Sequence, residues 1–309
     1  MSTTEAGASA PEGPSGRLWT EQVVGFSSGA RRLVGIVSAP SSGERGSRPG
    51  VVVLHGWGSY RSGPHRMLVE ICRRLASRGM TAMRFDFSGR GDSSGDYWDT
   101  DLDTMISDAR AAGDFLCSHI GQEALAALGL CSGSNVALGA ATRDRRFRAV
   151  CSLSALPFQK QRGKAQGATR ARGTLRELFL KALRPDTYRR LLRGEVAAGR
   201  ILRRLLLGEG GRSARAGMPD GKGEARNLKD SRRDIQSELA EFPGELLFIY
   251  GSADAEGLSG WRNVLEPFMR ENRRNYRQLE IPGADHDYHG LAVKERAARE
   301  AVEFLAEVV

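Results

Sequence analysis

Residues 124–138 read ALAALGLCSGSNVAL, and this stretch decides the fold. Residues 124–130 are all apolar or glycine, which is typical of a strand that is buried on both faces. A helical pattern opens at Ser132, so the chain passes from strand to helix in one tight turn at Cys131. Small residues, Gly129 and Gly133, flank that turn and complete a G-x-C-x-G pattern. We interpret it as a nucleophile elbow that carries a thiol.

Strands and helices alternate on both sides of this turn. The expected strands are 22–26, 32–38, 51–54, 81–87, 124–131, 149–153, 245–250 and 278–281. The expected helices are 64–78, 102–119, one that opens at 132, 261–271 and 291–308. Most of these strands are nearly continuous in apolar residues, which indicates a sheet covered by helices on both faces. The sequence therefore predicts an α/β fold with a mostly parallel eight-stranded sheet.

The alternation is interrupted once, which indicates an insertion. Residues 1–20 are expected to be a disordered N-terminal tail, and residues 21–309 a single α/β domain. Within that domain, 157–241 is expected to be a helical basic lid. Residues 157–240 hold 21 Lys and Arg against 9 Asp and Glu, whereas the whole chain has a formal net charge of +9. The basic character of the chain therefore belongs to the insertion.

The four cysteines, Cys72, Cys117, Cys131 and Cys151, show no paired spacing, which predicts free thiols in a reducing compartment. The chain has no run of roughly 18 to 20 uninterrupted apolar residues, the length that a membrane-spanning helix needs. Its N-terminus also has no apolar segment of the kind found in a secretory signal. The sequence therefore predicts a cytoplasmic protein, and we expect neither a metal nor a cofactor.

A second motif, Val-Leu-His-Gly-Trp-Gly at 53–58, directly follows an expected strand. An oxyanion needs two converging N–H donors, and the backbone of Trp57 and of Ser132 would supply them. His-Gly after a strand is only modestly specific by itself. We expect His55 to have a packing or loop-bracing role.

The C-terminal third supplies a candidate acid and a candidate base. Asp254 and His286 each lie in a loop that follows an apolar strand. In a sheet of this kind, such loops meet at the edge where catalytic groups gather. Asp254 would orient His286, which would exchange a proton with Cys131 and the leaving group. His289 is the rival base, while Asp254 could instead be a turn residue and Asp285 or Asp287 an exposed loop charge.

The chain from about residue 22 to its end resembles the α/β-hydrolase superfamily, in which the order is nucleophile, acid, histidine. Residues 84–93, RFDFSGRGDS, resemble a segment of its serine-aminopeptidase-like and acyl-esterase branches, where it is not catalytic. We therefore regard Asp86 and Asp92 as structural. Gly-Leu-Cys-Ser-Gly, Gly-Ala-Asp-His and the Leu- and Arg-rich insertion are most similar to hydrolases encoded with bacterial exosortase and exopolysaccharide systems. A cysteine at the nucleophile position is also similar to dienelactone hydrolases and polyhydroxyalkanoate synthases.

These residues predict a hydrolase that acts on an ester or thioester through Cys131, His286 and Asp254 and a covalent acyl-thioester. Acyl transfer is an alternative, because amines and thiols open a thioester readily. A catalytically inactive protein that binds a partner is the other alternative. The expected substrate is a small acyl compound. The basic lid suits contact with anionic lipid or a membrane surface, although a solvated basic cover explains its charge equally well. No nucleic-acid-binding motif accompanies the charge, so no nucleic acid is expected.

Overall fold

The computed structural model describes residues 18–41, 48–156, 229 and 231–308, and these contain one sheet. Its strands are β1 Trp19–Ser28, β2 Arg31–Pro40, β3 Gly50–Leu54, β4 Ala82–Phe85, β5 Leu125–Leu130, β6 Phe147–Leu153, β7 Glu245–Gly251 and β8 Arg277–Ile281. They lie in the order β1-β2-β4-β3-β5-β6-β7-β8. Both pairings of β2 are antiparallel, and all the others are parallel. The predicted α/β fold with a mostly parallel eight-stranded sheet is thus confirmed.

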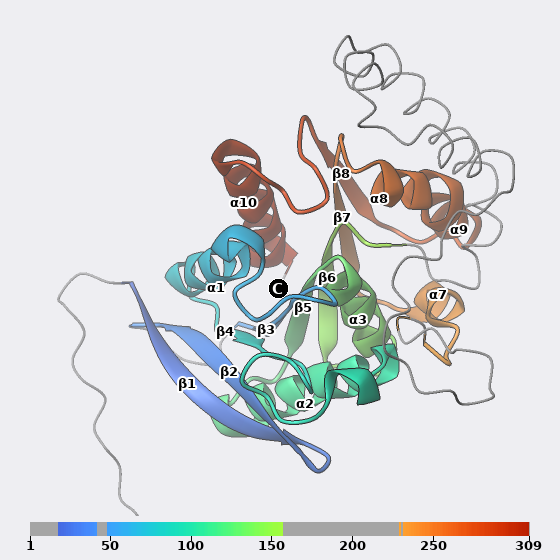
Figure 1. Ribbon diagram of the computed structural model, residues 1–309. Helices are drawn as coiled ribbons and strands as arrows, with labels where there is room; N and C mark the ends of the chain where they lie inside the picture. The colour runs from blue at the N-terminus through green and yellow to red at the C-terminus, as the bar shows by residue number, and fades with distance from the viewer. Residues whose placement is uncertain (1–17, 42–47, 157–228, 230, 309) are drawn as a thin grey trace, which may run out of the picture. The chain divides into compact units, whose positions relative to one another are not determined.

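Helices cover both faces of the sheet (Figure 1). Helices α1 Met67–Ser77 and α10 Leu291–Val308 pack on one face, and α2 Leu102–Ile120, α3 Ser132–Ala141 and the short α7 Ile235–Glu238 pack on the other. The sequence of strand β3 is uniformly apolar because both faces of the strand are buried. Val52 and Leu54 join the core on the α2 and α3 side, while Val51 and Val53 join the core on the α1 and α10 side. A strand with alternating apolar and polar residues would expose one row of polar groups to an apolar layer.

The helices differ from their expected bounds mainly at their starts. The expected helix 64–78 begins as a 3-10 turn, η1 Pro64–Arg66, before α1. The expected helix 261–271 is the second half of a longer helical segment, comprising α8 Ala255–Gly260, a π-helical turn η4 Trp261–Leu265 and α9 Glu266–Glu271. Pro267 lies in the first turn of α9 and has no N–H, so regular α-helical bonding cannot run through this point.

Two boundaries of the predicted domain organisation fall on described residues. Strand β1 begins at Trp19, just before the expected start of the domain at residue 21. The last part of the predicted lid, 231–241, contains α7 and the 3-10 turn η3 Leu239–Glu241, whose Ile235 and Leu239 are buried in the core. Apart from Lys229, the rest of the predicted lid, 157–230, lies outside the described residues.

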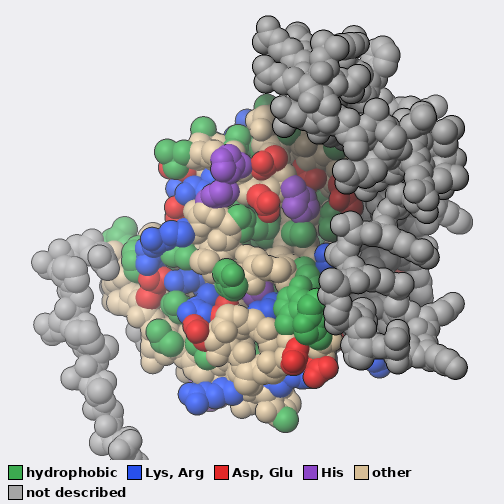
Figure 2. All heavy atoms as spheres, viewed as in Figure 1, with side chains coloured by type: hydrophobic (Ala, Val, Ile, Leu, Met, Phe, Trp, Pro, Cys, Tyr) green, Lys and Arg blue, Asp and Glu red, His purple; other side chains and the backbone are tan. Residues whose placement is uncertain are grey.

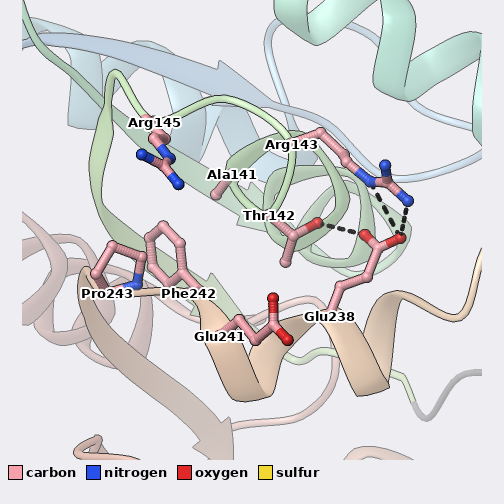
Figure 3. Close-up of a pocket in the computed structure, with 8 residues that line it drawn as sticks. All are labelled: Ala141, Thr142, Arg143, Arg145, Glu238, Glu241, Phe242 and Pro243. Carbon is pink, nitrogen blue, oxygen red and sulfur yellow. Dashed lines mark hydrogen bonds and ion pairs between the residues drawn. The ribbon is translucent and has the colours of Figure 1, made fainter.

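Polar contacts attach α7 to the end of α3 (Figure 3). Glu238 accepts hydrogen bonds from Thr142 Oγ1 at 2.9 Å and from Arg143 Nη2 at 2.6 Å. The residues shown line a cavity of about 330 Å³, which is separate from the Cys131 turn. None of the helices in the described ranges is long and apolar enough to cross a membrane.

Candidate active site

Cys131 occupies the turn between β5 and α3, near the centre of the sheet (Figure 1). Its backbone angles are φ 57° and ψ −122°, an unusual conformation for a residue with a side chain. The Cys131 N–H donates to Leu153 O at 2.8 Å, which ties the turn to the end of β6. This backbone geometry is the one expected of a nucleophile elbow.

The flanking glycines are required by close backbone packing. A Cβ on Gly129 would lie 2.2 Å from Gly133 O, and a Cβ on Gly133 would lie 2.5 Å from Leu54 O. Both neighbours are backbone atoms, which cannot move aside as a flexible side chain can. The two glycines of the G-x-C-x-G pattern are therefore explained by two steric constraints on the backbone around Cys131.

Asp254 and His286 lie next to each other at the same edge of the sheet. Asp254 follows β7 and His286 follows β8, and the two strands are parallel neighbours with Gly251 opposite Ile281. His286 Nδ1 lies 3.0 Å from Asp254 Oδ2. The other carboxylate oxygen of Asp254 accepts the Gly257 N–H at 3.0 Å, at the start of α8. Asp254 is buried, and its carboxylate is held by His286 and by the first turn of α8, which it caps.

His286 lies beside the Cys131 thiol and is close enough to shift its pKa. Since Asp254 holds Nδ1, the other ring nitrogen of His286 is the one that can exchange a proton with Cys131. Burial raises the pKa of the Cys131 thiol, but the hydrogen bond and the charge of His286, with hydrogen bonds from Ser132, leave this pKa below its ordinary value. These contacts favour a thiolate.

His286 shows the complementary shift. The hydrogen bonds to Asp254 and Cys131 raise its pKa to about 10, although burial acts in the opposite direction. The pKa of Asp254 is raised by burial but brought below its ordinary value by the hydrogen bond and charge of His286. The arrangement thus favours a thiolate, an imidazolium and a carboxylate in a row.

The rival histidine has different surroundings. His289 is exposed, and its Nδ1 faces His65 Nε2 at 3.0 Å. Its backbone N–H donates to Asp285 Oδ1 at 2.8 Å. Asp285 and Asp287 are both exposed. Of the two candidate bases, His286 is therefore the one that the structure brings to Cys131 and Asp254.

The two predicted oxyanion donors flank the thiol. Ser132 is the first residue of α3 and is buried, and its Oγ lies 3.8 Å from Cys131 Sγ. The loop of Trp57 also approaches Cys131, because a Cβ on Gly56 would lie 3.9 Å from Cys131 Sγ. Within the described part of the chain, the Trp57 N–H has no hydrogen-bond acceptor.

Two further polar residues, Ser154 and Tyr288, belong to this site and are not among the predicted site residues. Ser154 follows β6, is fully buried with φ 52°, and helps to lower the pKa of Asp254. Tyr288, two residues after His286, donates to Ile249 O at 2.8 Å and lies 3.2 Å from Ser154 Oγ. The position of Ser154 directly after an apolar strand is a sequence signal that could have drawn attention to it. Tyr288 offers no such signal.

Two observations concern the types of side chain that lie on this face of the molecule. The space-filling view shows histidine and acidic side chains together on the face that carries α10 and the loop after β8 (Figure 2). Among the residues that the structure describes, no group of three or more His, Cys, Asp or Glu is placed to hold a metal ion. The groups that the structure brings together at this site are a thiol, an imidazole and a carboxylate.

A family model, the alpha/beta hydrolase family, matches residues 51–302 of this chain. The chain belongs to that family. None of the curated proteins compared with this hydrolase matches it. Among solved structures, it is similar to Est1E from Butyrivibrio proteoclasticus with ferulic acid bound, with a TM-score of 0.62 and 17% identity over 92% of this chain and 98% of that one.

Other solved structures give the same picture. A dienelactone hydrolase from Anabaena variabilis is 17% identical over 94% of this hydrolase and 99% of its own chain, with a TM-score of 0.59. An esterase from Pyrococcus furiosus is 17% identical over 97% and 96% of the two chains, with a TM-score of 0.60. At these identities the likeness shows the fold. The family match, over most of the chain, supports the expectation of an α/β-hydrolase enzyme.

Proposed function

We propose that this protein hydrolyses an ester or thioester of a small acyl compound, with Cys131 as nucleophile, His286 as acid and base, and Asp254 as the group that orients His286. The observation that carries the proposal is the chain of contacts from the Cys131 thiol through His286 to Asp254, which ends in the 3.0 Å contact between His286 Nδ1 and Asp254 Oδ2. A thiolate is the nucleophilic form of cysteine, and these contacts favour the thiolate of Cys131.

In the first half-reaction, the Cys131 thiolate attacks the acyl carbonyl carbon and forms a carbon–sulfur bond. The carbonyl oxygen becomes an oxyanion that accepts hydrogen bonds from the N–H groups of Trp57 and Ser132. As the tetrahedral intermediate collapses, the bond to the leaving group breaks, and the His286 imidazolium donates its proton to the departing oxygen or sulfur. The products are the free alcohol or thiol and an acyl-thioester on Cys131.

In the second half-reaction, neutral His286 takes a proton from water, and the hydroxide attacks the thioester carbonyl. Collapse of this intermediate breaks the carbon–sulfur bond and restores the thiolate beside the imidazolium, while the acid product leaves. Asp254 stays ionised throughout and stabilises the charged ring. All the proton transfers pass through His286.

Intact-mass measurement after mixing with p-nitrophenyl esters or acyl thioesters tests the proposal. We expect a mass increase equal to one acyl group, located on Cys131 by peptide mapping, and its loss in Cys131→Ala. Cys117→Ala is the matched control, because Cys117 is also partly exposed but lies away from His286. An adduct that persists in Cys131→Ala would contradict the proposal.

Acyl transfer is the second candidate activity, and the cysteine favours it because amines and thiols open a thioester more readily than an ester. Adding an amine or thiol acceptor to the acylated protein distinguishes the two reactions. Formation of the acyl-acceptor product in preference to free acid would assign a transferase. A protein with no adduct and no turnover on any ester would support a partner-binding role instead.

The finer parts of the proposal concern the subtype and the lid. The Gly-Leu-Cys-Ser-Gly elbow supports placement among cysteine hydrolases encoded with exosortase systems. The excess of Lys and Arg in 157–241 supports contact between this segment and anionic lipid or an anionic substrate. Co-sedimentation with phosphatidylglycerol vesicles at rising salt tests the lid, with phosphatidylcholine vesicles as control. Binding that is equal for both lipids would contradict it.

A further inference from the structure

Arg90 is a buried cation without a carboxylate partner among the described residues. Only 5% of it is exposed, and its guanidinium lies 4.7 Å from the Trp57 ring centre and 4.6 Å from that of Tyr97. Burial lowers the pKa of Arg90, although Tyr97 and Asp108 act in the opposite direction. Burying a cation that no carboxylate neutralises is costly, so a specific gain must offset it.

The hydrogen bonds of Arg90 indicate what that gain is. Its Nε donates to Trp57 O at 2.8 Å. Its Nη1 donates to Ser88 O at 3.0 Å and to Thr100 Oγ1 at 2.9 Å. The planar guanidinium thereby fixes the loop after β3 against the loop after β4 through three acceptors. A lysine could not span these three acceptors with a single rigid group.

His55 holds the peptide unit that joins Gly56 to Trp57. It is fully buried, and burial lowers its pKa to about 4, although the hydrogen bond with Gly56 acts in the opposite direction, so the ring is neutral at pH 7. Its Nε2 accepts the Phe87 N–H at 3.4 Å, so Nδ1 carries the proton and donates to Gly56 O at 2.7 Å. The Gly56 carbonyl and the Trp57 N–H belong to one planar peptide unit, so this bond fixes the orientation of that N–H.

We infer that Arg90 and His55 are positioning residues that hold Trp57 as an oxyanion donor. His55 fixes the peptide that carries the Trp57 N–H, and Arg90 fixes the carbonyl that follows it. The N–H, which has no acceptor in the described part of the chain, is thus pre-oriented for the oxyanion formed during acylation of Cys131. This inference rests on the proposed function, and it assigns a role to Arg90, which lies in the segment 84–93 that the family resemblance implies is not catalytic.

Two reactions at the same sulfur atom separate positioning of the donor from a general structural role. Iodoacetamide forms a bond between Sγ and a saturated carbon and expels iodide, so no oxyanion develops. p-Nitrophenyl acetate acylates Sγ and passes through an oxyanion. Loss of a correctly placed N–H should slow acylation and leave alkylation unchanged. Damage to the elbow or to His286 should slow both reactions.

The variants are Arg90→Met, Arg90→Lys and His55→Gln, each checked for folding by circular dichroism. The control is Arg277→Gln, which removes an exposed arginine paired with Glu307. We expect acylation of Cys131 to fall about 100-fold in Arg90→Met, less in Arg90→Lys, and about 10-fold or more in His55→Gln. Alkylation should stay at the wild-type rate in all four proteins.

Wild-type acylation in Arg90→Met would overturn the inference, and so would an equal loss of acylation and alkylation in folded Arg90 variants. If Arg90→Met does not fold, the comparison of the two rates in Arg90→Lys decides the question. A wild-type protein that is alkylated but never acylated at Cys131 would overturn the proposed function itself. That result is distinguishable, because it is obtained before any variant is made.

Discussion

His286 Nδ1 lies 3.0 Å from Asp254 Oδ2, although 32 positions separate the two residues in the chain. The sheet brings them together, because each follows one of two parallel neighbouring strands. The contact leaves the second ring nitrogen for Cys131, which lies after a third parallel strand. Three loops from the same edge of the sheet thus supply three adjacent side chains.

The reactivity of Cys131 should exceed that of the other thiols. Burial raises the pKa of Cys72 to about 11 and also raises the pKa of Cys151 and of Cys117, whereas that of Cys131 is lowered. Iodoacetamide at pH 7 should therefore label Cys131 first. Peptide mapping of the folded protein measures this, and faster labelling of Cys117 would contradict it.

The pH dependence of that alkylation should depend on His286. In the wild type, the rate should stay high below the ordinary thiol pKa and fall as pH drops through the lowered pKa of Cys131. In His286→Gln, the burial of Cys131 remains but the favourable charge is lost, so the profile should move to higher pH. Rates measured from pH 5 to 10 test this. An unchanged profile in His286→Gln would show that His286 does not stabilise the thiolate.

Turnover should distinguish the two histidines. We expect His286→Ala to lower kcat by about 100-fold or more on any accepted ester, because it removes the proposed proton carrier. His289→Ala should keep nearly wild-type turnover, since His289 faces His65. Asp254→Asn should lie between them, because the ring remains but loses its orienting carboxylate. An inactive His289→Ala beside an active His286→Ala would reverse the assignment of the base.

The sequence alone predicts those parts of the site that follow from strand ends. Gly129, Cys131 and Gly133 mark a strand-turn-helix junction, and Asp254 and His286 each follow an apolar strand, so their meeting at one sheet edge is implied by parallel pairing. The sheet and its two covered faces follow from the same apolar runs.

Contacts between loops cannot be predicted from the pattern of the sequence. Arg90 reaches Trp57 O only because the loops after β3 and β4 approach each other, and residues 84–93 carry no mark of that contact. Tyr288 reaches Ile249 O because its loop folds back on β7. The π-helical turn η4 before Pro267 is not predicted either, since the apolar pattern continues through it. Such features depend on side-chain geometry in three dimensions, which periodicity does not contain.

Gly129→Ala should disrupt the elbow. The added Cβ would lie 2.2 Å from Gly133 O, so the backbone must shift. We expect a loss of about 1 to 3 kcal/mol in the free energy of unfolding, together with slower acylation of Cys131. Urea unfolding measures the first effect. Gly58→Ala is the control for stability, because a Cβ there meets no atom within 4 Å, and equal stability losses in the two variants would contradict the steric argument.

Tyr288→Phe should loosen the loop of His286. The hydroxyl is fully buried and donates to Ile249 O, so its removal leaves that carbonyl with one partner fewer. We expect a loss of about 0.5 to 1.5 kcal/mol in the free energy of unfolding and a lower kcat, because the loop carries His286. Tyr60→Phe is the control, since Tyr60 is exposed. Wild-type stability and turnover in Tyr288→Phe would show that the ring alone anchors the loop.

The pair formed by Asp254 and His286 should also stabilise the fold in a defined pH range. Because the pKa of His286 is raised from 6.5 to about 10, its contribution is fully present below pH 6.5 and is lost as pH rises through about 10. Because the pKa of Asp254 is lowered from 3.8, its contribution is present above pH 3.8 and is lost as pH falls through its folded-state pKa. Stabilisation by the pair should therefore be greatest between pH 3.8 and 6.5.

Urea unfolding of the wild type and Asp254→Asn at pH 5.5 and at pH 9.5 measures this contribution. At pH 5.5 we expect Asp254→Asn to be less stable by about 1.5 to 3 kcal/mol, the range for a buried hydrogen bond to a charged group. At pH 9.5 the difference should be smaller. The ring of His286 releases its proton when the protein unfolds, and a high pH favours this release. Asp287→Asn, which changes an exposed carboxylate in the same loop as His286, should show no difference at either pH. A difference for Asp254→Asn that is constant with pH would mean that the carboxylate stabilises the loop through Gly257 and not through the charge of His286.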